Sequence, residues 1–266
     1  VITDIDATRE MLNAFIRKVY GVSPFKPEIM ICVPIEVTSI EKKAIFDVTM
    51  GAKKIYLLEE GRAAIMGSGV NISLPEGHTV IDIGGGSTDI AILSLNEIVV
   101  STSIRVASNK FDEDIIKYVK RKFNLLIGDK TAENIKKEVG SAMEVPINEN
   151  ISTKIKGKDL VTGIPKTIDI TSNQINEAIK DSVNEIILAL KEVLEKCPPE
   201  LSSDILDNGI ILTGGGSLIR NLDKLIENKV NIPIHRATNS LESVVIGGAL
   251  AFDNKALLRT LEMREM

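Results

Sequence analysis

The sequence predicts an α/β fold, in which strands and helices alternate and ligands collect at the ends of strands. Within the first sixty residues, helical and strand-like patterns alternate, which is typical of this class. Two later apolar runs each end in a glycine triplet, at Gly84–Gly86 and at Gly214–Gly216. With 266 residues, the chain is long enough for one large or two ordinary domains.

Composition narrows the class of protein. Hydrophobic residues are 44% and charged residues 26%, as in a globular protein with buried cores, and the scarcity of aromatics (3%) makes those cores aliphatic. A net charge of −5 without a basic block argues against nucleic acid as a partner. Cys32 and Cys197 are far apart, which suits a reducing cytoplasm, and His78 and His235 lack metal-ligand spacing. No apolar run approaches the roughly 18 residues of a membrane span, and no signal peptide is visible.

The elements follow in order from hydrophobic periodicity. Residues 4–20 predict an amphipathic helix with Met11, Leu12, Phe15, Ile16 and Val19 on one face. A strand buried on both faces at 29–35, a helix capped by Ser39 that ends near Gly51, and a strand at 54–58 come next. Later expectations are a strand at 97–106, helices at 111–122 and 131–139 (opened by Thr131), strands around 153–156 and 166–170, a long helix at 172–196 and a helix at 241–253.

Residues 80–92 predict a β-hairpin with a glycine-rich tip. The glycines Gly84–Gly86 permit positive φ and a close approach of backbone to a ligand, and successive N–H groups there form a nest for an anion. Ser87 and Thr88 can donate to phosphate oxygens, and Asp82 at the strand end can hold a hydrated Mg²⁺. A glycine triplet also serves as a plain tight turn, so these residues alone leave both interpretations open.

Two further stretches carry candidate chemistry. Glu60 follows a strand end, where a carboxylate can orient a water, although an acidic residue there also simply favours a helix N-terminus. Residues 209–220 predict a buried strand, a glycine triplet and a helix whose N-terminus can face a phosphate or ribose; the alternative is a tight turn. The sequence contains no P-loop, H-E-x-x-H or G-x-S-x-G motif.

Taken in order, these motifs resemble those of a known superfamily. Glu-Glu-x-x-Ala-Ala at 59–64, Asp-Ile-Gly-Gly-Gly-Ser-Thr at 82–88, Leu-Thr-Gly-Gly-Gly-Ser at 212–217 and Gly-Gly-Ala at 247–249 resemble the actin-like ATPases, and within them the MreB family of bacterial actins. The resemblance runs through nearly the whole chain. It implies an actin-like ATPase fold, with two ribonuclease-H-like lobes around a cleft that binds ATP or ADP with Mg²⁺.

The resemblance also implies how the chain is divided. Residues 1–75 and 252–266 correspond to part of a first lobe, residues 76–110 and 172–251 to a second lobe, and residues 111–171 to a small insert subdomain. The family's N-terminal strand pair, with its first phosphate loop and the small subdomain that follows it, has no counterpart here. The chain also opens with Val1 rather than Met, so we expect it to be a fragment with an incomplete first lobe.

Site residues follow from the same resemblance. Asp82 corresponds to the residue that holds Mg²⁺ through water, and Glu60 and Ser87 to the pair that polarises and positions the attacking water. The residues expected to contact the nucleotide are Gly84, Gly85, Gly86, Ser87 and Thr88 at the phosphates, Glu133 and Lys136 at the ribose and adenine, and Gly214, Gly215, Gly216 and Ser217 in the adenosine motif. This chain departs from the family at Gly61, usually Pro, at Ser87, usually Thr, and at Ser108-Asn109, commonly Gly-Asp.

The implied function is that of a cytoskeletal ATPase. Such proteins polymerise with themselves into filaments on the inner face of the cell membrane, hydrolyse ATP and contribute to cell shape with the cell-wall machinery. In this chain, which lacks the first phosphate loop, we expect hydrolysis to be weakened or absent. Pro24 and Phe25 correspond to the family's membrane-insertion loop. One apolar loop binds a bilayer weakly, and polymerisation would multiply the contact.

Two other functions stay open. A filament-forming scaffold that binds nucleotide with little or no hydrolysis is favoured by Gly61, by Ser87 and by the lack of the first phosphate loop. A non-filament actin-like ATPase, such as a relative of chaperones or sugar kinases, is disfavoured because the chain has neither a peptide-binding domain nor a sugar-site insertion.

Overall fold

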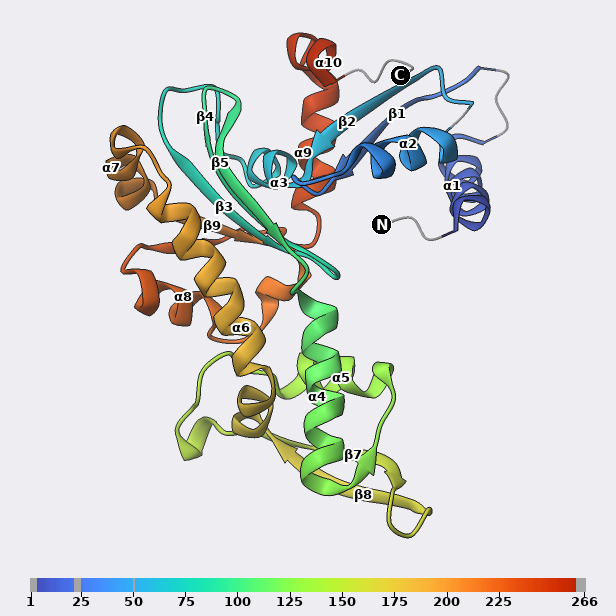
Figure 1. Cartoon of the computed structure of the whole chain (residues 1–266), viewed down its shortest axis with the longest axis vertical. Helices are drawn as coiled ribbons and strands as arrows, with labels where there is room; N and C mark the ends of the chain where they lie inside the picture. The colour runs from blue at the N-terminus through green and yellow to red at the C-terminus, as the bar shows by residue number, and fades with distance from the viewer. Residues whose placement is uncertain (1–3, 22–24, 50, 262–266) are drawn as a thin grey trace.

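The computed structural model describes residues 4–21, 25–49 and 51–261, which form three sheets surrounded by helices (Figure 1). The first sheet is a parallel pair, β1 (Glu28–Val33) and β2 (Lys54–Glu59). The second has five strands in the order β10-β9-β3-β4-β5, and the third has the order β6-β7-β8. Along the longest axis of the molecule, the third sheet lies at one end and α10 at the other, and α7 lies to the side in the half opposite the third sheet (Figure 1).

The rest of the described chain forms eight further strands, ten α-helices and two short 3₁₀ helices. The strands are β3 (His78–Ile83), β4 (Thr88–Ser94), β5 (Glu97–Ile104), β6 (Leu125–Leu126), β7 (Ser152–Asp159), β8 (Pro165–Thr171), β9 (Ile210–Thr213) and β10 (Ile234–Arg236). The α-helices are α1 (Ile5–Tyr20), α2 (Ser39–Val48), α3 (Glu60–Gly67), α4 (Ser108–Phe123), α5 (Asp129–Val139), α6 (Ser172–Glu195), α7 (Pro199–Asn208), α8 (Leu222–Val230), α9 (Ser243–Asp253) and α10 (Lys255–Leu261). Two short 3₁₀ helices are η1 (Ile147–Glu149) and η2 (Gly215–Leu218).

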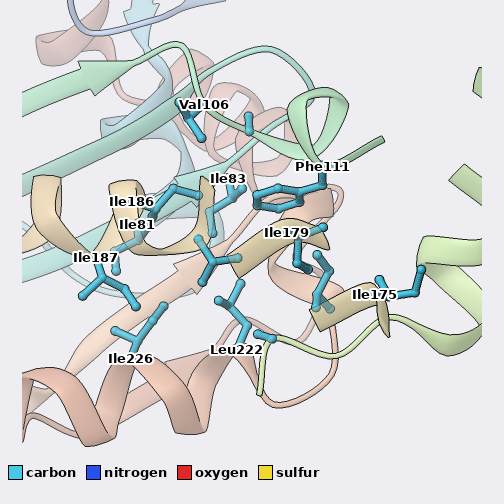
Figure 2. Close-up of a cluster of buried hydrophobic side chains, with 14 of the residues drawn as sticks. Ile81, Ile83, Val106, Phe111, Ile175, Ile179, Ile186, Ile187, Leu222 and Ile226 are labelled. Atoms are coloured by element: carbon cyan, nitrogen blue, oxygen red, sulfur yellow. The ribbon is translucent and has the colours of Figure 1, made fainter. Parts of the chain in front are cut away.

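The five-stranded sheet has two apolar faces, because successive side chains of a strand point to opposite sides. On one face, Ile81 and Ile83 of β3 join the main core with residues of α6 and α8 (Figure 2). On the other face, Val80 belongs to a second cluster that includes residues of α3. Asp82 is two residues after Val80 in β3, so its side chain points to the same face of the sheet, the α3 side. Its antiparallel partner in β4 is Asp89, which shares that face.

Helices α3 and α9 cross at backbone distance and connect the parallel pair to the five-stranded sheet. A Cβ added to Gly247 would lie 1.8 Å from the Ala63 carbonyl oxygen, and one added to Gly67 would lie 1.8 Å from that of Ser243. Only glycine fits at these two positions. This crossing places the first residue of α3, Glu60, beside the end of β3.

The predicted hairpin, its third strand, both strands of the small insert and the long helix from Ser172 are confirmed. The predicted full burial of the strand at 29–35 is wrong, because only Val33 of β1 is buried. The amphipathic helix predicted at 4–20 is present as α1, but no residue of α1 is buried, and Phe15 and Val19 are 56% and 88% exposed. The reason is that α1 packs mainly against α2.

Several helix starts differ from the expectation, and α4 begins at Ser108, three residues before the predicted start at 111. Thr38, not Ser39, caps α2, because its hydroxyl accepts from the Glu41 amide and the Glu41 carboxylate accepts from the Thr38 amide, which completes a capping box. Helix α5 starts at Asp129, two residues before Thr131, since Gly128 has the extended conformation of an N-cap. The second glycine triplet leads into η2 rather than an α-helix, and α8 begins only at Leu222.

Candidate functional site

A cleft of about 1360 Å³ lies where the tip of the β3–β4 hairpin, the start of α3, helices α4 and α5, and η2 meet. It collects residues that are far apart in the sequence. Those predicted for the site that line it are Glu60, Asp82, Gly84, Gly85, Gly86, Ser87, Glu133, Lys136, Gly214 and Gly215.

The hairpin tip presents backbone donors to this cleft. Gly84 donates to the Ser87 carbonyl at 3.0 Å, and the Gly85 carbonyl accepts from the amide of Asn109 at 2.9 Å, which ties the tip to the first turn of α4. Within the described residues, the amides of Gly85, Gly86 and Ser87 donate no hydrogen bond. Three successive free N–H groups match the requirement for binding an anion.

The reason for glycine at this tip differs from the expectation. None of the three has a positive φ, so the predicted use of left-handed backbone is wrong. Packing does not demand glycine at two of these positions: a Cβ on Gly86 would meet nothing within 4 Å, and one on Gly85 would only touch Asn109 at 3.6 Å. A Cβ on Gly84 would make a tight contact, 3.3 Å from the Ser87 carbonyl oxygen. What glycine preserves here is open space above the free amides, where a ligand can approach closely.

Three carboxylates gather beside the tip. The Asp82 Oδ1 accepts from the Thr213 hydroxyl at 2.9 Å, and the Asp89 Oδ1 accepts from the backbone N–H of Ile35 at 3.0 Å. The second oxygen of Asp89 is buried and has no hydrogen-bond partner within the described residues. Glu60, at the start of α3, completes the group with its half-buried carboxyl.

These carboxyls raise one another's proton affinity. Burial raises the pKa of Glu60 to about 7, and the like charges of Asp89 and Asp82 add to it. Burial also raises the pKa of Asp82 to about 6, against the lowering effect of the Thr213 hydrogen bond. Both pKa shifts are therefore caused mainly by burial, with the neighbouring negative charge adding to them.

A magnesium ion fits this chemistry when other ligands join it. Within the described part of the chain, no group of three or more His, Cys, Asp or Glu residues is arranged to hold a metal ion by itself. Mg²⁺ is commonly held by one or two carboxylates, with phosphate and water oxygens completing the shell. Asp82, beside free amides that would take phosphate, offers that arrangement.

At the α5 wall of the cleft, both predicted nucleoside contacts already have partners. The Lys136 ammonium lies 2.8 Å from the Asp112 carboxylate, 2.8 Å from the Ser108 carbonyl and 2.6 Å from its hydroxyl, which uses all three of its donors. Glu133 pairs with Lys130 and Lys137, and these hydrogen bonds lower its pKa to about 2. A nucleotide would have to share or displace these partners.

The second glycine triplet forms the facing wall. Gly214 has φ +81°, and a Cβ there would lie 2.2 Å from the Ile83 carbonyl oxygen, so glycine is required. Gly214 and Gly215 line the cleft. Gly216 and Ser217 turn inward and are buried, and the Ser217 hydroxyl donates to the Gly214 carbonyl.

Other predicted residues lie elsewhere. Thr88 is fully buried and its hydroxyl donates to the Val106 carbonyl at 2.6 Å, so it does not face the cleft. Phe25 is 76% exposed beside a separate hollow formed with Tyr20 and Lys53, and Pro24 lies outside the described residues. Sequence reasoning missed Asp89 and Arg220; for Asp89, its place opposite Asp82 in the hairpin was the available signal.

Among the helices that the structure describes, none combines the length and apolarity that crossing a bilayer requires.

The fold is that of the actin-like proteins. A crystal structure of MreB5 of Spiroplasma citri, described as bound to AMPPNP, matches with a TM-score of 0.91 at 39% identity, over 98% of this chain and 79% of that chain. The same protein described as bound to ADP matches with a TM-score of 0.90, over 96% of this chain and 77% of that chain. A MamK double helical filament matches at 0.79 and 19% identity, over 96% and 77% of the two chains, and supports the fold alone.

Sequence comparison gives the family. The model of the MreB/Mbl protein family matches residues 1–260. Cell shape-determining protein Mbl of Bacillus subtilis (strain 168) is 45% identical over 96% of this chain and 77% of its own length. Cell shape-determining protein MreB of Escherichia coli (strain K12) is 42% identical, over 95% of this chain and 74% of its own length. The chain belongs to the MreB/Mbl family.

Proposed function

We propose that this chain binds an adenine nucleotide with Mg²⁺ in the cleft and acts as an actin-like cytoskeletal protein in cell shape. One observation carries the nucleotide proposal: three free amides at the hairpin tip face the same cleft as Asp82, Glu60 and the Gly214–Gly215 wall. The ADP and AMPPNP described for MreB5, and the cell-shape role in the names of Mbl and MreB, support it.

In this proposal each wall has its own task. The amides of Gly85, Gly86 and Ser87 bind the terminal phosphates, and Asp82 holds Mg²⁺ through water. When bound, Mg²⁺ neutralises phosphate charge and orients the phosphates for displacement. The α5 and η2 walls, which carry Lys136 and Gly215, enclose the nucleoside.

We propose hydrolysis as the reaction of this site. Glu60, with a pKa raised to about 7, accepts a hydrogen bond from a water and aligns it with the terminal phosphate, and the Ser87 hydroxyl helps to place that water. Positioning a water in an electrostatically prepared site is how phosphoryl transfer to water is accelerated. Gly61, the second residue of α3, is buried, and a Cβ there would lie 2.9 Å from Cδ1 of Ile35.

Self-association is the second part of the proposal. Lys154, Lys156 and Lys158 are exposed on one face of β7, at one end of the long axis (Figure 1). In the opposite half of the molecule, Glu200 and Asp207 of α7 are exposed and acidic. Opposite charges in the two halves favour a head-to-tail contact between copies, and such a contact generates a filament when its rotation does not close into a ring.

Membrane association is the third part. The exposed Phe25 lies near the end of α1, whose Phe15, Val19 and Tyr20 are also more than half exposed. Apolar side chains beside the basic Arg17 and Lys18 suit the surface of an anionic bilayer. Phe25→Ala should weaken sedimentation with anionic liposomes, and unchanged sedimentation would contradict this part of the proposal.

We also propose the division of the chain into lobes that the resemblance implies. The β1–β2 pair with α1–α3 and α10 makes the first lobe (1–75 and 252–266), the five-stranded sheet makes the second (76–110 and 172–251), and α4 to β8 make the small subdomain (111–171).

A sedimentation assay combined with phosphate release tests the function. With Mg²⁺ and ATP, we expect this chain to sediment and to release phosphate at a low rate, and Glu60→Gln to sediment while releasing about a hundredfold less phosphate, the lower end of the usual range for a positioned general base. Sedimentation with no phosphate release from the unchanged chain would favour the scaffold alternative. Phosphate release without sedimentation would favour a non-filament ATPase.

A further inference from the structure

Arg220 lies on the cleft wall two residues after η2 and belongs to neither the phosphate end nor the predicted nucleoside contacts. Its side chain reaches away from its own segment. The Nε donates to the carbonyl of Gly140 at 3.3 Å, and Nη2 donates to the Ser172 hydroxyl at 2.7 Å. Gly140 ends α5, and Ser172 is the fully buried first residue of α6. One guanidinium therefore joins three segments.

The neighbouring backbone strengthens this junction. The Ala142 amide donates to the Arg220 carbonyl at 2.8 Å, and Ser141 and Arg220 form a parallel β-bridge. The Asn221 side chain donates to the Ser141 hydroxyl at 3.2 Å. The segment after α5 and the segment after η2 thus run side by side. These two segments continue directly into the two walls that face each other across the nucleoside end of the cleft.

The geometry calls for arginine rather than for a positive charge. No carboxylate pairs with Arg220 within the described residues, and its two acceptors are a carbonyl and a hydroxyl. The guanidinium is a rigid fork that donates in two fixed directions, whereas a lysine ammonium is a single point on a flexible stem. Only the fork fixes the distance between Gly140 and Ser172.

We propose that Arg220 is a positioning residue that sets the separation between the α5 wall and the η2 wall, and so determines how well the cleft holds the nucleoside part of a nucleotide. The proposal rests on the proposed nucleotide binding. It places the effect at the nucleoside end, because the phosphate-binding amides at 85–87 have no bond to this junction.

Titration calorimetry with Mg²⁺ tests it with two ligands on the same protein. ATP reports the whole site, and inorganic tripolyphosphate, measured by displacement of ATP, reports the phosphate end alone. For Arg220→Met we expect ATP affinity to fall about tenfold, since two hydrogen bonds are lost, and tripolyphosphate affinity to change less than about twofold. Arg220→Lys should lose about threefold for ATP, because the charge remains but the fork is gone.

Two further variants control for folding. Arg121→Met makes the same change at an exposed residue of α4 and should alter neither affinity. Ser172→Ala removes only the hydroxyl acceptor and should lower ATP affinity in the same direction but less. Melting temperatures of all variants, recorded by circular dichroism, show whether the fold persists. If Arg220→Met does not fold, Ser172→Ala carries the test.

The outcomes distinguish a failure of nucleotide binding from a failure of the positioning role of Arg220. A wild-type chain that binds no ATP overturns the proposed function and the role of Arg220 with it. A wild-type chain that binds ATP, with variants whose affinities for ATP and tripolyphosphate fall in proportion, overturns the positioning role and leaves Arg220 as a purely structural residue. If Arg220→Lys equals wild type while Arg220→Met loses affinity for both ligands, the charge acts on phosphate and the proposal is wrong.

Discussion

At the residue scale, the site depends on which face of a strand each polar side chain occupies. Ser87 and Thr88 are adjacent hydroxyls, yet Ser87 lines the cleft while Thr88 is buried and bonded to Val106. The sequence could not distinguish them, because the pairing register decides which residue leaves the ladder. Asp82 was predictable from its strand end, whereas Asp89 gains meaning only as its cross-strand partner.

The raised pKa of Glu60 predicts a pH-dependent cost to the unliganded fold. The carboxyl has a pKa of about 7 when folded and an ordinary value near 4.5 when unfolded. Between these values the folded state keeps a proton that the unfolded state releases, so stability falls as pH rises from about 4.5 to 7. Glu60→Gln should make this fall shallower by about 1–2 kcal/mol, with allowance for partial exposure.

Urea unfolding at pH 5 and pH 8, without nucleotide or Mg²⁺, measures this difference. The matched variant Glu192→Gln changes an exposed carboxyl of α6 and should follow the wild-type pH dependence. A Glu60→Gln chain whose stability falls as steeply as that of the wild type would contradict the assignment.

At the scale of elements, the strands and helices were largely predictable, and their packing was not. Two apolar runs around a glycine tip predict the hairpin at 80–92, and Pro198-Pro199 predict where the long helix ends. The contact between α3 and α9 left a weaker signal, since Gly247 and Gly248 look equivalent in sequence. Only the three-dimensional packing shows that Gly247 meets a backbone carbonyl and Gly248 does not.

That contrast predicts opposite effects for two neighbouring substitutions. Gly247→Ala puts a Cβ 1.8 Å from the Ala63 carbonyl oxygen and should destabilise the fold by about 3 kcal/mol, the upper range for overpacking. Gly248→Ala meets only Cys32 and Met30 sulfurs at 3.6 and 3.7 Å and should gain up to about 1 kcal/mol from helix propensity. Urea denaturation compares the two; equal effects would show that the helices do not cross as described.

The start of α2 predicts a second paired comparison. Thr38→Ala removes the hydroxyl that forms one half of the capping box, and should lower the free energy of unfolding by about 1 kcal/mol. Ser39→Ala changes the first helical residue, whose side chain makes no capping bond, and should be neutral within about 0.5 kcal/mol. Thermal unfolding followed by circular dichroism distinguishes them. A larger loss of stability from Ser39→Ala than from Thr38→Ala would show that Ser39, the residue predicted from the sequence, is the N-cap.

At the scale of the whole molecule, charge is distributed unevenly between the two halves. The chain is acidic overall, yet one face of β7 presents three exposed lysines, and α7 presents Glu200 and Asp207. No local pattern predicts that these segments lie in opposite halves of the molecule, because their separation depends on how the insert projects from the five-stranded sheet.

Reversing one of these charges should therefore weaken self-association. Lys156→Glu should raise the critical concentration for sedimentation severalfold, because like charges then meet across a head-to-tail contact. Lys180→Glu makes the same change on α6 away from the β7 lysines and should sediment as the wild type does. Adding Asp207→Lys to Lys156→Glu should restore sedimentation, and a failure of all three to differ would exclude a charge-guided contact.

The central claim is that one cleft, built from the hairpin tip, α5 and η2, takes a nucleotide with Mg²⁺. Hydrogen exchange of this chain with and without Mg²⁺ and ATP tests it most directly, since it reports on each segment separately. Below the concentration at which the chain assembles, we predict slower exchange in peptides that cover residues 84–87, 129–140 and 214–220, with the exposed β7–β8 hairpin unchanged. Unaltered exchange in those three segments at saturating ATP, or protection confined to other surfaces, would contradict the account.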